Sequence, residues 1–453
     1  MRPSHPGLNG LPKIFYFIPT ILALVTSLCI IYCINLTSNY TGFLLGKPYI
    51  GSFLIQKRIP FLQIPNSIDI KTKVPLPDSG NSERLSEGEL DLNIGKENNI
   101  NNGVFHDKMV FLEDYKAMNK SLKIYVYPHS KDDSFANVLL PVDFKPGGNY
   151  ASESYFKKCL MKSHFITKDP KEAHLFFLPF SIASLRHDPR VGVHGIQDFV
   201  RSYIYNISQA YPYWNRSGGA DHFYVACHSI GRSAMEKAVD VKFNAIQVVC
   251  SASYYLSGYV AHKDASMPQI WPREGDPPKA GSTKRDKLAF FAGSNNSPVR
   301  QNLLEHWRND SEISVHFGNL SIPYSKALSH SKFCLHVKGF EVNTARIADA
   351  LFYGCVPIVI ANHYDLPFTD ILDWKKFSLV VATLDIPLLK EILHEISFED
   401  YEELQRNVLE VRKHFQWHKV PENYDAFYMV MYELWLRRGL ARIPVPESNQ
   451  LYF

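Results

Sequence analysis

Short apolar runs alternate with helical patterns through most of the chain, and this alternation is the strongest constraint on its fold. The runs are rich in β-branched and aromatic residues, which is typical of strands. They fall into two series, 122–128, 173–179, 222–226 and 245–249, then 288–293, 333–337, 355–360 and 377–381. Helical patterns lie between them at 151–162, 194–209, 298–308, 343–353 and 386–415. Strands that alternate with helices predict parallel βαβ units, and the lack of a fixed repeat argues against a solenoid.

A break in composition separates the two series. Residues 272–287 (PREGDPPKAGSTKRDK) are rich in Pro, Gly and charge, as an interdomain linker would be. We therefore expect two α/β domains, 119–275 and 285–440, that face each other across a cleft. Doubly wound sheets bind ligands beyond the carboxyl ends of their strands, so a nucleotide-type substrate in that cleft is the natural hypothesis.

The N-terminal region contains a membrane-spanning pattern. Residues 14–34 (IFYFIPTILALVTSLCIIYCI) hold no charged side chain over 21 positions, a length of roughly 30 Å as a helix. A cleaved signal peptide and a buried helix are the alternatives, but no Ala-x-Ala cleavage pattern follows. Arg2 and Lys13 precede the segment and Lys47 follows it. The excess of positive charge before it predicts a cytosolic tail at 1–13 and a lumenal remainder.

After the predicted span, residues from about 60 to 105, which include PDSGNSERLSEGELDLNIGKENNINNG, are polar, acidic and nearly free of aromatic side chains. We expect residues 35–118 to form a lumenal stem, with an exposed loop of the folded part as the alternative. Several Asn-x-Ser/Thr acceptors for N-glycosylation support a secretory compartment. The candidates are Asn119, Asn206, Asn215, Asn295, Asn309 and Asn319.

Charge and cysteine content exclude some function classes. Lys and Arg total 49 against 45 Asp and Glu, a balance too mild to indicate nucleic acid as a partner. Five cysteines follow the span, an odd number, so at least one is free or pairs between chains. None has CxxC spacing, which argues against zinc, and Cys227–Cys250 is the best disulfide candidate.

Residues 334–361 (CLHVKGFEVNTARIADALFYGCVPIVIA) are the segment richest in chemistry. The pattern predicts a strand, a turn, a helix capped by Asn343 or Thr344, and a second strand. A carboxylate such as Asp349 suits the vicinal hydroxyls of ribose, and Arg346 suits a diphosphate by bidentate pairing. The alternative is an ordinary surface ion pair between these two residues.

Several motifs in this order resemble exostosin-like glycosyltransferases of family 47, particularly those of plants. The longest is KGFEVNTARIADALFYGCVPIVIANHYDLPFTDILDW. The others are YASE (150–153), DPKEAHLFFLPF, GGADHFYVACH (218–228), HKDASMPQIWP (262–272) and LAFFAGSNNSPVR (288–300). Together the motifs cover about 122–440.

This resemblance implies a GT-B fold of two Rossmann-like domains, an inverting transfer and a Golgi type II membrane anchor. The donor would be a nucleotide-sugar, with a UDP-sugar as the expected kind, held mostly by the C-terminal domain. The acceptor would be a cell-wall polysaccharide or another glycan. Carried over, the donor-binding candidates are Arg300, Lys338, Glu341, Arg346 and Asp349. The sequence leaves open the sugar, the linkage and whether the chain forms a homo- or hetero-oligomer in the Golgi.

The catalytic base is less well defined by the resemblance. The Asp221–His222 pair and His228 are the candidates, and Asp188, Lys263 and Asp264 are further residues that could contact donor or acceptor. Many relatives have Cys-His-Asp where this chain has Cys-His-Ser at 227–229, and Cys-Pro-Ser-Gly where it has His-Val-Lys-Gly at 336–339. These departures keep two alternatives open, a catalytically silent scaffold subunit of a synthase complex and a glycan-binding protein.

No Asp-x-Asp pair, which GT-A transferases use to hold a divalent cation, occurs in the chain. The charge of the diphosphate would then be met by Arg, Lys and helix N-termini. We expect no metal site and no required cofactor.

Overall fold

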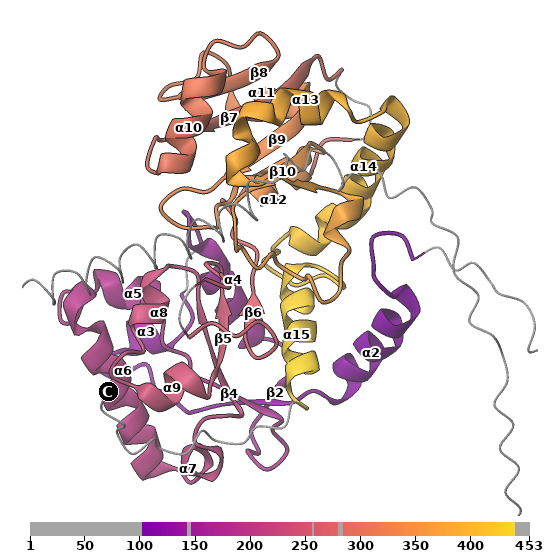
Figure 1. Cartoon of the computed structure of the whole chain (residues 1–453). Helices are drawn as coiled ribbons and strands as arrows, with labels where there is room; N and C mark the ends of the chain where they lie inside the picture. Colours follow the sequence, from indigo (N-terminus) through magenta and orange to yellow (C-terminus); the bar gives the residue numbers. More distant parts are fainter. Residues whose placement is uncertain (1–101, 143–145, 256–257, 280–283, 440–453) are drawn as a thin grey trace, which may run out of the picture. The chain divides into compact units, whose positions relative to one another are not determined.

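The computed structural model describes residues 102–142, 146–255, 258–279 and 284–439, all within the compact unit Gly95–Phe453. This part of the chain contains two parallel sheets, drawn below and above in Figure 1. The first sheet comprises β1 (Ile124–Val126), β2 (Ile166–Thr167), β3 (Leu175–Phe177), β4 (His222–Ala226), β5 (Ile246–Val249) and β6 (Ala265–Ser266). The second comprises β7 (Lys287–Gly293), β8 (Ile313–Phe317), β9 (Ser331–Val337), β10 (Val356–Ile360) and β11 (Leu379–Val380). The prediction of two parallel α/β domains is therefore confirmed.

Both sheets reverse their winding next to the first strand. The order is β2-β1-β3-β4-β5-β6 in one sheet and β11-β10-β9-β7-β8 in the other. Each order is doubly wound, and ligands bind at the carboxyl ends of the strands where the order reverses. The crevices expected from topology lie beside β1 and β3 and beside β7 and β9.

The central strands are buried along their whole length. Every residue of β4, β5 and β10 is buried, as expected for parallel strands covered on both faces. All eight strands predicted from the sequence are present. The short edge strands β2 and β6 and the mixed-polarity strand β8 were not predicted, because their patterns are brief or alternate with polar residues.

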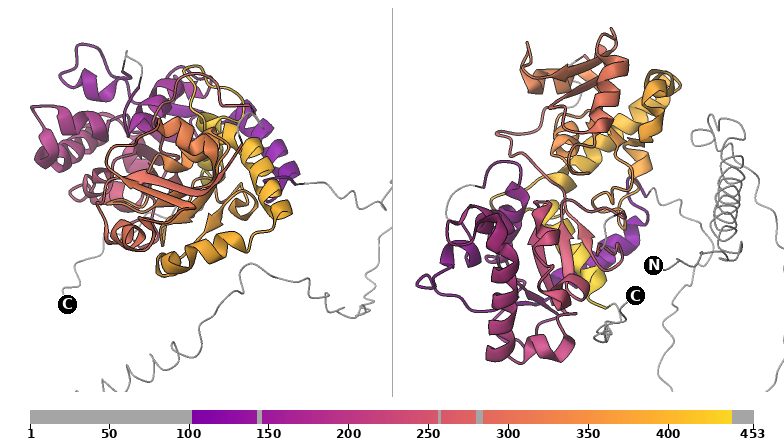
Figure 2. Two further views of the ribbon diagram at one scale, coloured as in Figure 1. Left: turned by 90° about the horizontal axis from the view of Figure 1, so that it is seen from above. Right: turned by 60° about the vertical axis from the view of Figure 1, so that its left-hand side comes forward.

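Helices pack on the faces of both sheets (Figure 2). In the first half they are α2 (Lys108–Ser121), α3 (Ala136–Leu139), α4 (Ala151–Leu160), α5 (Ile182–His187), α6 (Gly192–Ala210), α7 (Tyr213–Ser217), α8 (Ile230–Ser233) and α9 (Val239–Phe243). In the second half they are α10 (Pro298–Trp307), α11 (Tyr324–His330), α12 (Arg346–Phe352), α13 (Leu389–His394), α14 (Phe398–Val411) and α15 (Ala426–Arg437), with 3₁₀ turns η2 (Trp374–Lys376), η3 (Thr383–Leu388) and η4 (Arg412–Phe415).

The N-terminal boundary of the folded part differs from the prediction. The stem predicted for 35–118 includes residues 102–118, yet helix α2 (Lys108–Ser121) belongs to the core. Phe111 and Tyr115 of α2 are buried, and Tyr115 stacks on Tyr424 at 4.4 Å between ring centroids. The sequence signal was weak because only one narrow stripe of this helix is apolar. The remainder of the predicted stem, 35–101, lies outside the described residues.

One apolar core joins the two halves. It runs from Ile124 and Phe223 of the first sheet to Phe333 and Ile358 of the second. The last helix, α15, contacts α2, α4 and β6, so the chain returns to the first sheet after completing the second. This return fixes the two sheets against each other and defines the space between them.

Two disulfides reinforce the sheet ends. Cys227–Cys250, predicted from the sequence, links the residues that follow β4 and β5. Cys334–Cys355, which was not predicted, links β9 to the residue before β10. Cys159 remains as a buried free thiol among the described residues.

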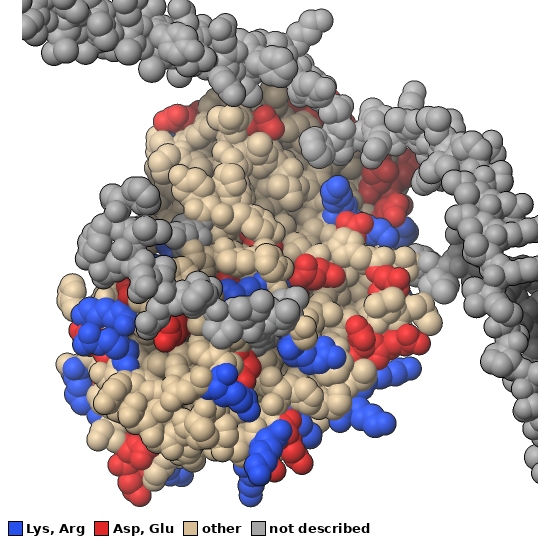
Figure 3. Space-filling model, turned by 60° about the horizontal axis from the view of Figure 1, so that its bottom comes forward, with Lys and Arg blue, Asp and Glu red and all other residues tan. Residues whose placement is uncertain are grey.

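Among the described residues, none of the helices has the length and hydropathy needed to cross a membrane. The predicted span at 14–34 lies outside the described part of the chain. On the face shown in Figure 3, basic and acidic side chains of the described residues are intermingled, in line with the mild net charge of +4.

Candidate functional site

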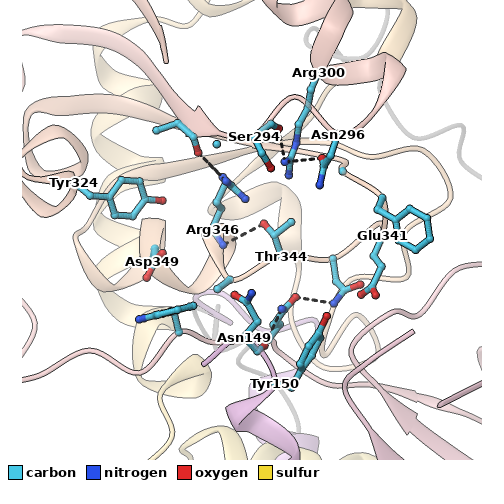
Figure 4. A pocket seen from close by; sticks show the side chains of 18 of the residues that line it. Asn149, Tyr150, Ser294, Asn296, Arg300, Tyr324, Glu341, Thr344, Arg346 and Asp349 are labelled. Carbon is cyan, nitrogen blue, oxygen red and sulfur yellow. Dashed lines mark hydrogen bonds between the residues drawn. The ribbon is translucent and has the colours of Figure 1, made fainter. Parts of the chain in front are cut away.

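Two adjoining cavities open where the sheets face each other. The larger has a volume of about 590 Å³ and lies at the carboxyl ends of β7 and β9, as the topology predicts (Figure 4). Its lining includes Tyr150, Gln269, Arg273, Asn296, Arg300, Tyr324, Glu341, Thr344, Arg346 and Asp349. The smaller, of about 220 Å³, is lined by residues including His228, Ser229, Arg232, Tyr255, Lys338 and His363. Phe340 and Glu341 line both cavities, so the loop that carries them lies at the boundary between the two.

Arg346 is the least committed cation in the larger cavity. Its Nε and Nη2 donate to the Ala292 carbonyl at 2.9 and 2.7 Å, and its guanidinium lies 5.1 Å above the Phe291 ring. Of five guanidinium N–H groups, three have no partner in the described part of the chain. Gly293 makes this position possible, because a Cβ there would approach Arg346 Nη2 to within 2.4 Å. Arg346 can therefore bind an anion without losing its own anchor.

Arg300 is more fully engaged. It donates from Nε and Nη2 to the Val337 carbonyl and from Nη1 to the Ser294 carbonyl and to Asn296 Oδ1, at 2.9–3.2 Å. Burial, with a smaller effect of Arg346, lowers its pKa to about 10, so it stays charged at neutral pH. Arg300 therefore adds positive charge to the cavity while it holds the loop after β7 against the end of β9.

A short segment before α10 explains how Arg300 is placed. Ser297 caps the helix by accepting from the Arg300 N–H at 3.2 Å, and Pro298 occupies the first helical turn. The Ser297 hydroxyl donates to the Lys338 carbonyl at 2.7 Å. One hydroxyl thus joins the loops that follow β7 and β9.

Asp349 forms an ion pair that the sequence did not indicate. Arg273 donates to its two carboxylate oxygens at 2.7 Å each. Burial raises the pKa of Asp349, and the Arg273 pair opposes that rise. The predicted alternative, a surface pair between Arg346 and Asp349, does not form. Arg273 was missed because it follows the HKDASMPQIWP motif in a linker-like context.

Glu341 lies on the loop between β9 and α12 rather than on a helix. Helix α12 begins at Arg346, three residues later than predicted, and Thr344 Oγ1 accepts from the Arg346 N–H at 3.3 Å. Glu341 Oε1 accepts from the Ser229 N–H at 3.3 Å and lies 3.9 Å from His228 Nδ1. The carboxylate therefore stands at the junction of the two cavities, as Figure 4 shows for the larger one.

His228 lies beside Glu341 with its ring largely fixed. Tyr150 stacks on it at 4.4 Å between centroids, and the Ile230 N–H donates to Nδ1 at 3.1 Å. Burial, together with nearby Arg186 and His187, lowers the pKa of His228. A neutral ring whose Nδ1 accepts carries its hydrogen on Nε2. The ring then presents a donor, which suits orienting a ligand better than removing a proton.

A buried carboxylate helps to position His228 through the backbone of the preceding residue, Cys227. Glu153 of α4 accepts from the Cys227 N–H at 3.1 Å and from the Ser181 hydroxyl at 2.6 Å. Burial raises the pKa of Glu153. With the Cys227–Cys250 disulfide, this contact holds the turn after β4. Glu153 was present in the YASE motif, but nothing in the sequence indicated that it reaches Cys227.

The Asp221–His222 pair does not reach either cavity, and its assignment as catalytic is corrected. His222 begins β4, so it lies at the amino end of a strand whose carboxyl end faces the site. Its ring nitrogens contact Asp221 Oδ1 and the Tyr127 hydroxyl, each at 2.8 Å. His222 is fully buried and packs against the rings of Tyr127, Phe176 and Trp214. Its role is therefore structural.

Asp188, Lys263 and Asp264 form structural contacts, and Lys338 lies elsewhere than predicted. Asp188 pairs with Arg190 and accepts from Asn137. Asp264 is buried, pairs with Lys263 and accepts from the Gln247 and Val260 N–H groups. Lys338, expected in the donor set, lines the smaller cavity rather than the larger. Of the candidate glycosylation sites, Asn119 is half-buried and the other five are exposed.

A family model described as the exostosin GT47 domain matches residues 118–396 of this chain. The chain is 36% identical over 353 residues to a probable glycosyltransferase of Arabidopsis thaliana, covering 75% of this chain and 66% of the relative, just under two thirds of its length. A second probable glycosyltransferase of the same plant is 34% identical, covering 76% and 75%. A probable glucuronosyltransferase of Oryza sativa subsp. japonica is 26% identical, covering 67% and 74%.

Proposed function

The chain belongs to the exostosin GT47 family of glycosyltransferases, and we propose that it moves a sugar from a UDP-sugar to a hydroxyl of a glycan acceptor. The observation that carries this proposal is the position of Glu341, which lines both cavities. The larger cavity would hold the donor and the smaller the acceptor. Two doubly wound sheets that face one site are the arrangement expected of a GT-B enzyme.

The larger cavity suits a nucleoside diphosphate. Arg300 and Arg346 bring two positive charges to the carboxyl ends of β7 and β9, and Arg346 keeps three N–H groups available. Guanidinium groups match phosphate oxygens well. Charge builds on the leaving diphosphate in the transition state, so these arginines would stabilise it more than the ground state. They support transfer without a divalent cation.

Glu341 is the best placed general base. Its carboxylate would take the proton of the acceptor hydroxyl as the hydroxyl oxygen attacks the anomeric carbon and the bond to UDP breaks. The other carboxylate of the larger cavity, Asp349, is held by Arg273. The Nε2–H of His228 would orient the acceptor. With Glu341 as the base and Asp349 paired to Arg273, neither carboxylate of the larger cavity is left to act as a nucleophile, which supports a single displacement that inverts the anomeric centre.

The sugar and the acceptor are narrower questions. The relatives include proteins named as probable glucuronosyltransferases, so UDP-glucuronate joins the neutral UDP-sugars as a donor to test. We propose a plant cell-wall polysaccharide as the acceptor class. The decisive experiment incubates the lumenal part, from about residue 100, with each UDP-sugar and reads released UDP with and without wall glycans. No release with any donor, in a protein that binds UDP, would contradict transfer.

We also propose a Golgi type II topology. The uncharged segment 14–34 and the exposed Asn-x-Ser acceptors support it, as do two disulfides, which persist in oxidising compartments. Glycosidase treatment should increase gel mobility, and protease added to sealed microsomes should spare the large domain. Digestion of that domain from outside would refute the topology.

A further inference from the structure

We propose that the smaller cavity recognises the carboxylate of a uronic acid residue in the acceptor glycan, through Arg232 and Lys338. The inference rests on the proposed function, because it treats this cavity as the acceptor side of the site. It names a substrate class, an anionic polysaccharide, that the transfer reaction alone does not require.

The charge of the lining is the first argument. Arg232 of α8 and Lys338 at the end of β9 both line the cavity, and neither forms an ion pair with a carboxylate of the described residues. Glu341 is the one carboxylate in the lining, and it accepts from the Ser229 N–H. Two cations thus face one anion in a partly enclosed space. A ligand carboxylate would gain charge-assisted hydrogen bonds there.

Exposed aromatic rings beside these cations are the second argument. The exposed fractions are 80% for Tyr255 and 82% for Phe340. Tyr255 lies 5.6 Å from the His363 ring between centroids. Both rings line the smaller cavity, so they are accessible to a ligand that enters it. Flat rings, with Ser251, Ser253 and Asn362 nearby, suit the apolar faces and the hydroxyls of sugar rings.

The position of the cations favours the acceptor over the donor as the source of the carboxylate. Arg232 and Lys338 line only the smaller cavity, whereas Arg300 and Arg346 line only the larger. The diphosphate of a donor would occupy those two arginines. A second anion on the other side of the base therefore belongs to the molecule that the base deprotonates.

Binding of short oligogalacturonides tests the proposal, with their methyl esters as the matched neutral ligand. Calorimetric titrations would compare wild type, Arg232→Gln and Lys338→Gln. The matched control is Lys237→Gln, which removes a surface cation that pairs with Asp198 outside the smaller cavity. We expect the acid to bind at least about tenfold tighter than the ester. Each cavity variant should lose most of that difference, and the control should keep it.

Three outcomes would overturn the proposal. Equal binding of acid and ester removes the carboxylate site, and an equal loss in Lys237→Gln reduces it to general charge attraction. If Arg232→Gln and Lys338→Gln instead weaken UDP-glucuronate relative to UDP-glucose, the cations serve the donor. Titration of UDP alone separates these failures from failure of the proposed function, because UDP needs only the larger cavity.

Discussion

Replacing Arg346 with Ala tests the donor cavity most directly. The Arg346 guanidinium donates two N–H groups to the Ala292 carbonyl, and its other three N–H groups can bind a ligand. One charge-assisted hydrogen bond to a diphosphate contributes about 1.5–3 kcal/mol, which is about ten- to hundredfold in affinity or rate. We expect Arg346→Ala to weaken UDP binding and lower kcat/KM by at least about tenfold. Because charge develops on the leaving group, part of the loss should appear in kcat.

The same substitution also removes a structural contact, which must be separated from the loss of binding. The Ala292 carbonyl loses its donor, at a cost of about 1 kcal/mol beside a solvent-filled cavity. Arg285→Ala is a matched control, since Arg285 donates to the Leu328, Ser331 and Tyr353 carbonyls and lines neither cavity. It should lower the melting temperature and leave UDP affinity unchanged.

Arg346→Lys refines the result. A single ammonium cannot hold the Ala292 carbonyl and reach a diphosphate together, so rescue should be partial. Calorimetric titration of UDP at a temperature where all variants are folded gives the answer. If Arg346→Ala binds UDP within about twofold of wild type, Arg346 is only a structural arginine, and the assignment of the larger cavity to the donor fails with it.

Three further predictions test the rest of the site. Glu341→Gln should reduce the rate of transfer by about 100-fold or more and leave UDP affinity nearly unchanged. His228→Asn, whose amide oxygen can still accept from the Ile230 N–H, should reduce the rate of transfer by about tenfold. The reverse order in single-turnover rates would make His228 the base. Asp349→Asn and Arg273→Gln should each weaken donor binding, and a double-mutant cycle should give a coupling energy of about 0.5–3 kcal/mol, with additivity counting against a functional pair. Transfer should persist in excess chelator, and complete loss restored by Mn²⁺ would show that the arginines do not suffice.

The sequence predicted the order of elements better than the contacts between them. Parallel strands such as β4 and β10 carry long apolar runs because they are covered on both faces, so their positions are visible in a single sequence. Helix α2 escaped detection because its apolar stripe is completed by Tyr424 and Tyr432, about 300 residues away. Local patterns do not report such partners.

The candidate site shows the same division. Arg300, Glu341, Arg346 and Asp349 were selected from motifs near the ends of β7 and β9, where topology places ligands. The histidine of the Asp221–His222 pair was misjudged because a sequence does not show which end of a strand faces the site. Arg273 depends on a contact across 76 positions, and only the folded chain brings it to Asp349.

The loop that carries Glu341 is held by both halves of the molecule. From the second sheet, His336 contacts the Val342 carbonyl at 2.8 Å and Thr344 Oγ1 at 3.1 Å. Burial lowers the pKa of His336 to about 3, so the ring stays neutral and keeps these contacts at working pH. From the first half, Gln269 donates to the Asn149 carbonyl at 2.8 Å and accepts from Asn343 Nδ2 at 2.7 Å.

This double attachment would couple donor binding at Arg346 to the placement of Glu341, the proposed base. Arg346 lies two residues after Thr344, at the start of helix α12. A diphosphate bound to Arg346 would therefore constrain the same loop that positions Glu341. Two hydrogen bonds from the first half hold this loop, Asn343 Nδ2 to Gln269 Oε1 and the Ser229 N–H to Glu341 Oε1, so we expect the position of the proposed base to depend on them. The proposed base would then be aligned chiefly when both cavities are formed and the acceptor occupies the place that water would otherwise take. This arrangement would favour transfer to the glycan over hydrolysis of the donor. Gln269→Ala should therefore raise the ratio of hydrolysis to transfer, a ratio that a purely structural glutamine would leave unchanged.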